Sequence, residues 1–307
     1  MADGIRTLGF IGLGVMGEPM CRHLVTKSGK RVIAYDLSAE ALQRVVDAGA
    51  AAAASVAEVT QAADLIFVSL PSGEHLREVC EGPGGVLSAA RPGQTFVDLG
   101  TSPLKLTRQL AERFGEAGLR YADAPVARTR AAAEQGTLAI TVGAEPELFV
   151  VVEPLLRCFA AEVTHCGAAG GGQIVKILNN MVVVGTVIAL SEAAAIGGAA
   201  GIETEQLFET FAKGSADSFA LRNHGLKAIA AQSFPERVFS TDYMLKDIRY
   251  ALEMAQDAGV DPRLADYARD LLERASRLGQ GGNYWPIIAN LYRPARDAAA
   301  GTATAAE

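Results

Sequence analysis

The feature that most constrains the fold of this chain is a helix-forming stretch at residues 170–201. It begins with three consecutive glycines, becomes strongly apolar from residue 182 onward, and contains only isolated glycines that a helix tolerates. At ~1.5 Å per residue, a helix of this length would span roughly 45 Å, which is more than the width of a small domain. We therefore expect this helix to belong to two domains.

Two polar side chains follow the glycines at the start of this stretch. Lys176 and Asn180 are four residues apart, so on a helix they face the same side, one turn apart. A glycine cluster directly before them would let another body approach closely, which is typical of a site. A lysine solvated at a helix start is the alternative, and this pattern alone favours it.

Composition excludes several classes of protein. The chain has 307 residues, of which 50% are hydrophobic, and a formal net charge of −7; this excludes a disordered chain and gives no support for nucleic-acid binding. Four cysteines and four histidines are dispersed, so we expect neither a disulfide framework nor a metal site. The first residues lack a signal-peptide pattern, and the apolar stretch 182–190 is shorter than the ~20 residues of a membrane span. A cytoplasmic protein without a membrane partner is expected.

A strand, a glycine turn and a helix open the chain. An apolar run at 7–11 leads into Gly12-Leu13-Gly14-Val15-Met16-Gly17, and residues 18–25 continue as a helix. In a dinucleotide-binding turn, the first glycine makes the tight turn, the second lets backbone amides reach a pyrophosphate, and the third lets the helix pack closely on the strand. The next strand, 31–35, ends at Asp36, nineteen positions after Gly17, where an acidic residue binds the adenosine ribose. Asp36 favours NAD over NADP because its carboxylate would repel a 2′-phosphate; a turn or cap before Ser38 is its alternative role.

Strands and helices alternate through the rest of the first half. Further strands are predicted at 64–70, 95–99, 119–122, 137–142 and 162–165, with helices at 39–48, 74–80, 104–116 and 145–159. This alternation predicts an α/β fold with a doubly wound, mainly parallel Rossmann-type sheet, in which ligands bind beyond the carboxyl ends of the strands. The segments at those ends are Leu70-Pro71-Ser72, Gly100-Thr101-Ser102-Pro103 and Asp123-Ala124-Pro125-Val126. The alternative for Pro71 and Pro125 is that each only ends a strand, but together with the glycine turn these segments predict a shared cleft.

The second half shows helical spacing without strand alternation. Helices are predicted at 204–213, 220–231, 243–259, 262–278 and 284–292. We therefore divide the chain into a dinucleotide-binding Rossmann domain at 1–166, a long interdomain helix at 167–201 and an all-helical domain at 202–307. Tyr284 and Trp285 are expected to anchor a core or a subunit contact, and the tail at 298–307 is expected to be mobile.

The order of these segments resembles the β-hydroxyacid dehydrogenase family, which includes 3-hydroxyisobutyrate dehydrogenase and tartronate semialdehyde reductase. The matching segments are residues 9–17 with Pro19-Met20, then 98–103, 123–126, 136–138, 172–180 and Lys246-Asp247. The resemblance implies that Lys176 is the catalytic residue, assisted by Asn180. It implies cofactor contacts from Gly12, Leu13, Gly14, Val15, Met16, Gly17, Asp36, Leu70, Pro71, Thr101, Phe239 and Lys246, and substrate contacts from Thr101, Ala127, Arg128, Thr129, Lys176, Asn180 and Asp247. For Phe239 a core position, and for Lys246-Asp247 a solvated charge pair, are the alternatives.

Two departures from the family pattern concern the substrate. The family usually has Ser-Gly-Gly after Asp-Ala-Pro-Val, where this chain has Ala127-Arg128-Thr129, and its Asp-x-Ser-Thr is here Asp98-Leu99-Gly100-Thr101. The Arg-Thr pair resembles the sulfolactaldehyde reductase branch. Arginine offers a planar fork of donors and a permanent charge, which suit an anion larger or more distant than a small carboxylate. Pairing of Arg128 with Glu134 on a solvated face is the alternative.

The resemblance implies an NAD-dependent oxidoreductase that moves a hydride between nicotinamide and a short 3-hydroxy acid or its semialdehyde. Lys176 would exchange the hydroxyl proton, because an ammonium half-buried beside a cationic nicotinamide is disfavoured and its proton becomes transferable near neutral pH. Reduction of 3-sulfolactaldehyde, with Arg128 on the sulfonate, is the second hypothesis. An imine reductase or a non-catalytic NAD-binding interaction protein are further hypotheses, although such relatives typically lack the lysine. Family members bury the long helix between subunits, so a homodimer or homotetramer is expected.

Overall fold

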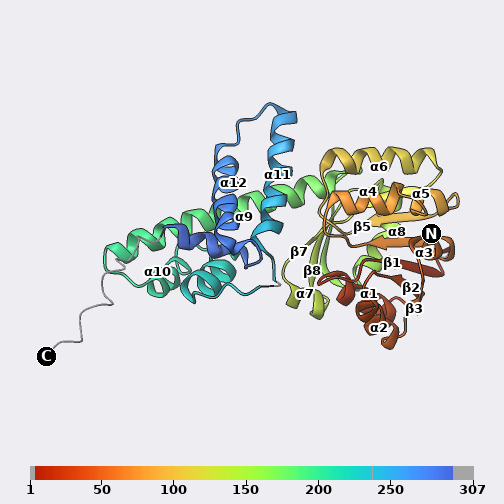
Figure 1. The fold of residues 1–307 in the computed structure, drawn as a ribbon, viewed down its shortest axis with the longest axis horizontal. Helices are drawn as coiled ribbons and strands as arrows, with labels where there is room; N and C mark the ends of the chain where they lie inside the picture. Colours follow the sequence, from red (N-terminus) through yellow and green to blue (C-terminus); the bar gives the residue numbers. More distant parts are fainter. Residues whose placement is uncertain (1–3, 237, 293–307) are drawn as a thin grey trace. The chain divides into compact units, whose positions relative to one another are not determined.

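The computed structural model describes residues 4–236 and 238–292. The chain divides into two compact units, Met1–Leu178 and Asn179–Glu307, and the division falls within the long helix α9, Gly171–Ala199 (Figure 1). This helix therefore contributes residues to both units, as its length predicted. The division into 1–166, 167–201 and 202–307 stays a prediction, and the tail at 298–307 lies outside the described residues.

The first unit is built on a sheet of six parallel strands. Their spatial order is β3 (Ala51–Ala52), β2 (Arg31–Tyr35), β1 (Thr7–Ile11), β4 (Leu65–Val68), β5 (Thr95–Asp98) and β6 (Arg120–Asp123). All five neighbouring pairs are parallel, and this 3-2-1-4-5-6 order is that of a doubly wound dinucleotide-binding fold. The predicted α/β class with a Rossmann-type sheet is confirmed.

Helices cover both faces of this sheet because successive side chains of each strand point to opposite faces. Leu8 and Phe10 of β1 pack on one face, whereas Ile11 packs on the other. The first face is covered by α1 (Gly17–Lys27), α2 (Ala39–Asp47) and α8 (Pro146–Leu156). The second face is covered by α3 (Val56–Ala62), α4 (Gly73–Glu81), α5 (Val86–Ala89) and α6 (Leu104–Glu116). In Figure 1, α4, α5 and α6 lie on one side of the sheet and α1 and α2 on the other.

A separate three-stranded sheet follows the main one. It consists of β7 (Val126–Ala127), β8 (Leu138–Val142) and β9 (Ala160–His165), with the short helix α7 (Arg130–Gln135) between β7 and β8. The β7–β8 pair is antiparallel and the β8–β9 pair is parallel. The sequence predicted the strands at 137–142 and 162–165 but not their departure from the main sheet, because alternation identifies elements and not their pairing partners. It also missed β3, β7, α3, α5 and α7, which are too short for a clear period.

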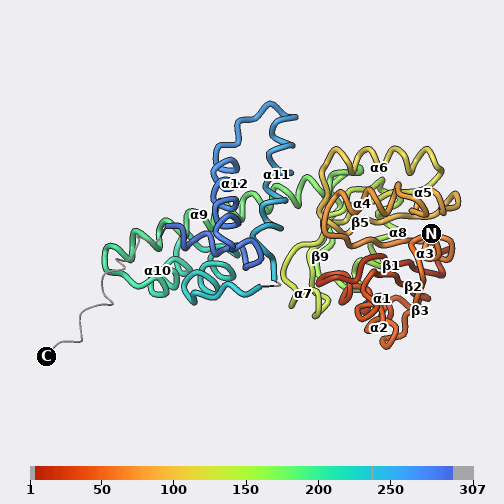
Figure 2. Tube along the Cα trace, viewed as in Figure 1, coloured from red at the N-terminus to blue at the C-terminus, as the bar shows by residue number. Residues whose placement is uncertain are grey.

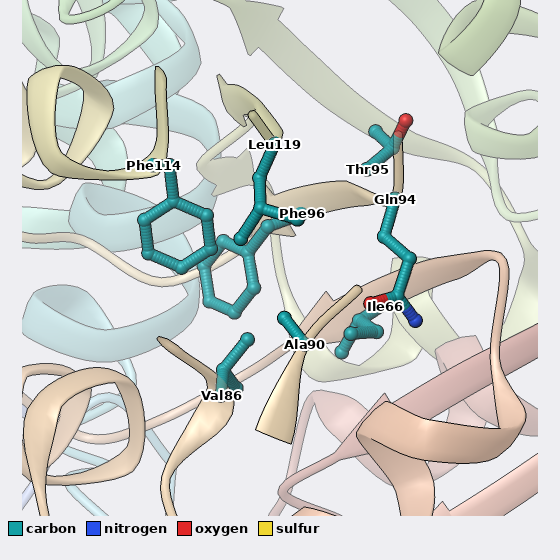
Figure 3. A pocket seen from close by; sticks show the side chains of 8 residues that line it. All are labelled: Ile66, Val86, Ala90, Gln94, Thr95, Phe96, Phe114 and Leu119. Atoms are coloured by element: carbon teal, nitrogen blue, oxygen red, sulfur yellow. The ribbon is translucent and has the colours of Figure 1, made fainter. Parts of the chain in front are cut away.

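A small apolar pocket lies in the first unit away from the predicted site. Side chains that include Ile66, Phe96, Phe114 and Leu119 surround it (Figure 3), and it leaves no room for a water molecule. Thr95, which also lines it, begins β5, so the pocket lies at the amino ends of the strands. It is therefore a feature of core packing, at the opposite end of β5 from Gly100 and Thr101.

The second unit contains the remainder of α9 and a set of shorter helices. These are α10 (Thr204–Phe211), the π-helix η2 (Leu221–Ala230), α11 (Thr241–Ala258), α12 (Arg263–Ala275), the π-helix η3 (Ser276–Gln280) and the 3₁₀-helix η4 (Trp285–Tyr292). Figure 2 shows α11 and α12 running antiparallel and side by side. Trp285 is fully buried in the core of this unit. Within 179–236 and 238–292 the only β-pairing is isolated bridges, so the predicted all-helical second domain is confirmed.

Helix α9 is more apolar over its length than the sequence analysis allowed. It has 29 residues, and its most apolar window has a mean hydropathy of 1.8, so length and composition alone would let it cross a membrane. The predicted apolar stretch at 182–190 was therefore too short. A core helix passes the same test, and 44% of that window is buried within the protein, so this is weak evidence for a membrane span.

Candidate active site

The glycine motif forms a tight turn between β1 and α1. Gly12 has a φ of +92°, and a Cβ there would lie 2.2 Å from the backbone oxygen of Ser69. A Cβ on Gly17 would lie 2.0 Å from the backbone oxygen of Gly12, so both positions require glycine. Gly14 differs, because nothing lies within 4 Å of its Cβ position. The open space over Gly14 fits a pyrophosphate on the backbone amides at the start of α1.

Asp36 is fixed beside this turn. Its Oδ2 accepts a hydrogen bond from the backbone N–H of Leu13 at 2.6 Å, and its Oδ1 accepts one from the N–H of Ser38 at 2.7 Å. Ser38 is itself the N-cap of α2, accepting from the N–H of Ala41. Asp36 therefore has the turn contact that was considered as its alternative role, and in addition holds the glycine turn next to the end of β2.

The segments predicted to form a cleft follow the carboxyl ends of adjacent strands. Asp36 follows β2, the glycine turn follows β1, Leu70-Pro71-Ser72 follow β4, Gly100–Pro103 follow β5 and Ala124–Val126 follow β6. Strands β1 and β4 are neighbours at the point where the strand order reverses. Dinucleotides bind at such a switch point, so the strand order brings these predicted segments of the first unit to one edge.

A buried carboxylate attaches the start of α9 to this edge. Asp123, at the end of β6, is fully buried; its Oδ1 accepts from the N–H of Gly170 at 2.6 Å and its Oδ2 from the N–H of Gln173 at 2.8 Å. Burial raises the pKa of Asp123 to about 6, against these hydrogen bonds, which lower it. A Cβ on Gly172 would lie 2.5 Å from the backbone oxygen of Thr141. The glycine cluster therefore allows the start of α9 to pack closely against the first unit itself.

Asn180 belongs to a buried polar chain in the second unit. Its Nδ2 donates to Oδ2 of Asp247 at 2.6 Å, and Oδ1 of Asp247 accepts from Nζ of Lys246 at 2.8 Å. The side chain of Asp247 is 0% exposed and that of Lys246 is 17% exposed, so the alternative of a solvated charge pair is wrong. The Lys246 ammonium lies 4.4 Å from the centre of the Tyr243 ring, a favourable cation–π contact.

Phe239 and Lys176, two further predicted site residues, lie in different units. Phe239 is partly buried against the core of the second unit, with its ring 5.3 Å from that of Tyr243. Lys176 is partly buried on α9 and belongs to the first unit, whereas Asn180 belongs to the second. The structure thus places the glycine turn, Thr101 and Lys176 in the first unit, and Asn180, Lys246 and Asp247 in the second.

The Ala127-Arg128-Thr129 segment has an unusual backbone. Arg128 has a φ of +85°, a conformation that is costly for any residue except glycine. Its guanidinium is exposed and donates from Nη1 to the backbone oxygen of Thr137 at 2.7 Å. Glu134 pairs instead with Arg130 at 2.9 Å, so the structure does not show the alternative pairing with Arg128. Thr129 caps α7 through its hydroxyl, which accepts from the N–H of Ala132 at 3.3 Å.

Comparison with known proteins identifies the family. Two family models match: the NAD binding domain of 6-phosphogluconate dehydrogenase over residues 7–167, and the NAD-binding region of NADP-dependent 3-hydroxyisobutyrate dehydrogenase over residues 170–290. The 2-(hydroxymethyl)glutarate dehydrogenase of Eubacterium barkeri is 36% identical over 274 residues, covering 89% of this chain and 90% of that protein. The chain belongs to the β-hydroxyacid dehydrogenase family.

Other members of the β-hydroxyacid dehydrogenase family match over nearly their whole length. The NAD-dependent L-serine dehydrogenase of Pseudomonas aeruginosa is 29% identical over 295 residues, covering 94% of this chain and 99% of that protein. The structure of Mycobacterium tuberculosis 3-hydroxyisobutyrate dehydrogenase with L-serine superposes with a TM-score of 0.86 at 29% identity, covering 94% of this chain and 100% of that one. The chain is accordingly an NAD(P)-dependent oxidoreductase of the hydroxy-acid class.

Three buried polar residues around the site of this β-hydroxyacid dehydrogenase were missed as individual site residues. The predicted site residues did not include Asp98, Asp123 or Gln173. Each of these is at most 1% exposed and bonds to the backbone of a predicted site segment. A signal was available for the two aspartates, because each directly follows a pair of apolar strand residues, Phe96-Val97 and Tyr121-Ala122. Such a residue is rarely buried without a partner. For Gln173 the sequence offers no comparable signal.

A buried histidine in the second unit is expected to make the stability of this dehydrogenase sensitive to acid. Nδ1 of His224 lies 2.6 Å from the Tyr284 hydroxyl, and its ring centre lies 5.1 Å from that of Trp285. Burial lowers the pKa of His224 to about 4. The histidine of the unfolded chain binds a proton near pH 6.5, whereas His224 in the folded chain binds one only near pH 4. The stability that His224 contributes should therefore be complete above pH 6.5 and should be lost as the pH falls from 6.5 through 4. The full loss corresponds to roughly 3 kcal/mol.

Urea unfolding at pH values from 7 to 4 measures this effect. The free energy of unfolding should fall more steeply with acid in the wild type than in His224→Gln. The exposed His75 provides a matched control, and His75→Gln should keep the slope of the wild type. Equal slopes for His224→Gln and the wild type would contradict the assignment.

Proposed function

We propose that this enzyme is an NAD-dependent dehydrogenase that interconverts a short 3-hydroxy acid and its semialdehyde. The observation that carries the proposal is the attachment of α9 to the dinucleotide-binding edge: Asp123 holds the backbone of Gln173, three residues before Lys176. The relatives named for 2-(hydroxymethyl)glutarate, L-serine and 3-hydroxyisobutyrate support the substrate class, because these acids share a hydroxymethyl group on the carbon next to a carboxylate.

The residues of the chain have separate roles in this proposal. NAD, when bound, accepts or supplies the hydride. The amides of the glycine turn bind its pyrophosphate at the amino end of α1, and Asp36 binds the ribose hydroxyls, which supports NAD over NADP. Lys176 exchanges a proton with the substrate hydroxyl and Asn180 orients the substrate. Further cofactor contacts come from Leu70, Pro71, Thr101, Phe239 and Lys246, and further substrate contacts from Thr101, Ala127, Arg128, Thr129 and Asp247.

Initial-rate assays with purified protein test this function. The panel contains 3-hydroxyisobutyrate, L-serine and 2-(hydroxymethyl)glutarate with NAD⁺ or NADP⁺, and matched semialdehydes with NADH. At least one acid should reduce NAD⁺, with a kcat/KM about tenfold or more above that for NADP⁺. An absence of turnover with every acid and aldehyde would contradict the proposed function, and a preference for NADP⁺ would contradict the role of Asp36.

A second substrate, 3-sulfolactaldehyde, is favoured by the geometry of Arg128. Its exposed guanidinium is anchored at Nη1 by the carbonyl of Thr137, and its backbone has a conformation that is normally left to glycine. A strained residue of this kind persists where the surroundings or the function require it. A permanent positive charge with a planar fork of donors suits a sulfonate. With 3-sulfolactaldehyde added to the panel above, a kcat/KM for it above that of every carboxylate semialdehyde would establish this alternative, and a lower value would contradict it.

We propose further that the chain self-associates through α9. Val182, Ala189 and Ile196 are exposed and seven residues apart, so they form an apolar seam along one face of the helix. Beside this seam, Val182, Val260 and Leu264 line an apolar hollow of about 790 Å³. Because a seam on one copy can pair with the same seam on another, light scattering should show a homodimer or homotetramer. Val182→Glu should shift it toward the monomer, whereas a monomeric wild type would contradict the proposal.

A further inference from the structure

Gln173 is a buried amide that bridges two parts of the first unit. It is fully buried near the start of α9. Its Oε1 accepts a hydrogen bond from the backbone N–H of Ser102 at 3.1 Å, and its Nε2 donates to the backbone oxygen of Gly100 at 2.8 Å. These two partners flank Thr101, so a single side chain holds the backbone on both sides of that residue.

The same loop is also held by Asp98, at the end of β5. Its Oδ1 accepts from the backbone N–H of Gly100 at 2.9 Å, and its Oδ2 accepts from the hydroxyl of Ser102 at 2.9 Å. Four hydrogen bonds therefore fix the two neighbours of Thr101, two from the end of β5 and two from α9. Thr101 lies between these two neighbours and is itself 7% exposed.

The backbone of Gln173 is fixed as firmly as its side chain. Its N–H donates to Oδ2 of Asp123 at 2.8 Å, which attaches the first turn of α9 to the end of β6. Lys176 lies three residues further along the helix, on the same face. Gln173 thus connects the Thr101 loop to the turn of α9 that carries Lys176.

We propose that Gln173 is a positioning residue that sets the Thr101 loop relative to Lys176, so that Thr101 meets the nicotinamide half of the cofactor. The contact between Thr101 and the cofactor rests on the proposed function, whereas the hydrogen bonds of Gln173 are observed in the structure. An apolar side chain of similar size would leave the carbonyl of Gly100 and the N–H of Ser102 without their helix-side partner. The loop would then shift, and contacts to nicotinamide would weaken while contacts to the adenosine half remain.

Calorimetric titration with NADH and with ADP-ribose tests this inference without turnover. Gln173→Met should weaken NADH binding by about tenfold, because one or two hydrogen bonds are lost, and should change ADP-ribose binding by less than about twofold. Gln43→Leu, on the exposed face of α2, is the matched control and should change neither affinity. Equal weakening of both ligands, or of neither, would overturn the proposal.

A double-mutant cycle separates positioning from general destabilisation. Thr101→Val should weaken NADH binding in the wild type but have little further effect in the Gln173→Met background, because the loop is already displaced. Additive losses would show that Gln173 does not act through Thr101. If Gln173→Met fails to fold, Gln173→Asn keeps a buried amide but is one carbon too short to reach both Ser102 and Gly100. It should show the same selective loss of NADH affinity to a smaller extent, and an equal loss for both ligands, or no loss for either, would overturn the proposal.

These binding measurements also distinguish this inference from the proposed function. A selective loss of NADH affinity in a protein that oxidises no hydroxy acid would sustain the role of Gln173 and refute the substrate class. Turnover of a hydroxy acid, together with additive losses in the double-mutant cycle, would sustain the substrate class and refute the role of Gln173.

Discussion

Replacing Lys176 with methionine should lower kcat by about 10³-fold or more while leaving the affinity for NADH within about threefold. Methionine keeps the length of the side chain but cannot exchange a proton with the substrate hydroxyl. The cofactor is bound in this proposal by the glycine turn, Asp36 and the Thr101 loop, and the variant leaves each of these unchanged. Rates come from following NADH absorbance, and affinities from NADH fluorescence.

Lys213→Met makes the same chemical change at an exposed lysine of the second unit and should retain the rate of the wild type. Thermal unfolding of both variants shows whether a loss of rate follows from a loss of fold. If Lys176→Met keeps most of its activity, the general acid and base is another group. If it loses NADH affinity in proportion to rate, Lys176 binds the cofactor and does not transfer the proton.

Replacing Arg128 should raise the KM for the anionic substrate by about 10- to 100-fold, because a charge-assisted hydrogen bond is lost. The two simplest replacements should differ in stability. Glycine adopts a φ of +85° without steric cost, whereas alanine keeps the cost that arginine has. Arg128→Gly should therefore be more stable than Arg128→Ala by about 1 kcal/mol, the reverse of their order at an ordinary position.

Chemical denaturation gives the difference in stability, and initial rates with carboxylate and sulfonate aldehydes give the KM values. Arg130 is two residues away and pairs with Glu134, so Arg130→Ala serves as the control and should leave the KM unchanged. An unchanged KM in both Arg128 variants would show that the arginine does not bind the substrate. Equal stability of the glycine and alanine variants would show that the backbone is not strained there.

Local patterns in the sequence were sufficient for much of the fold. The glycine turn and Asp36 have fixed spacings that a short strand, turn and helix impose, so the nucleotide-binding half followed from residues near one another. The long helix at 170–201 was predicted within two residues at either end, observed at Gly171–Ala199, because its apolar character persists over many turns. Short elements such as β7 and α7 contain too few residues for any period to show.

The sequence by itself determined the α/β class, the helical second half, the nucleotide turn and the position of Lys176 on a helix, because all of these depend on spacing along the chain. Only the tertiary structure decided which strands form the second sheet, that Asp247 is buried against Asn180, and that Gln173 holds the Thr101 loop. The Gln173–Ser102 bond joins residues 71 apart and the Asn180–Asp247 bond residues 67 apart. Such contacts arise when distant segments are packed together, and no local pattern records which partner a buried polar group will find.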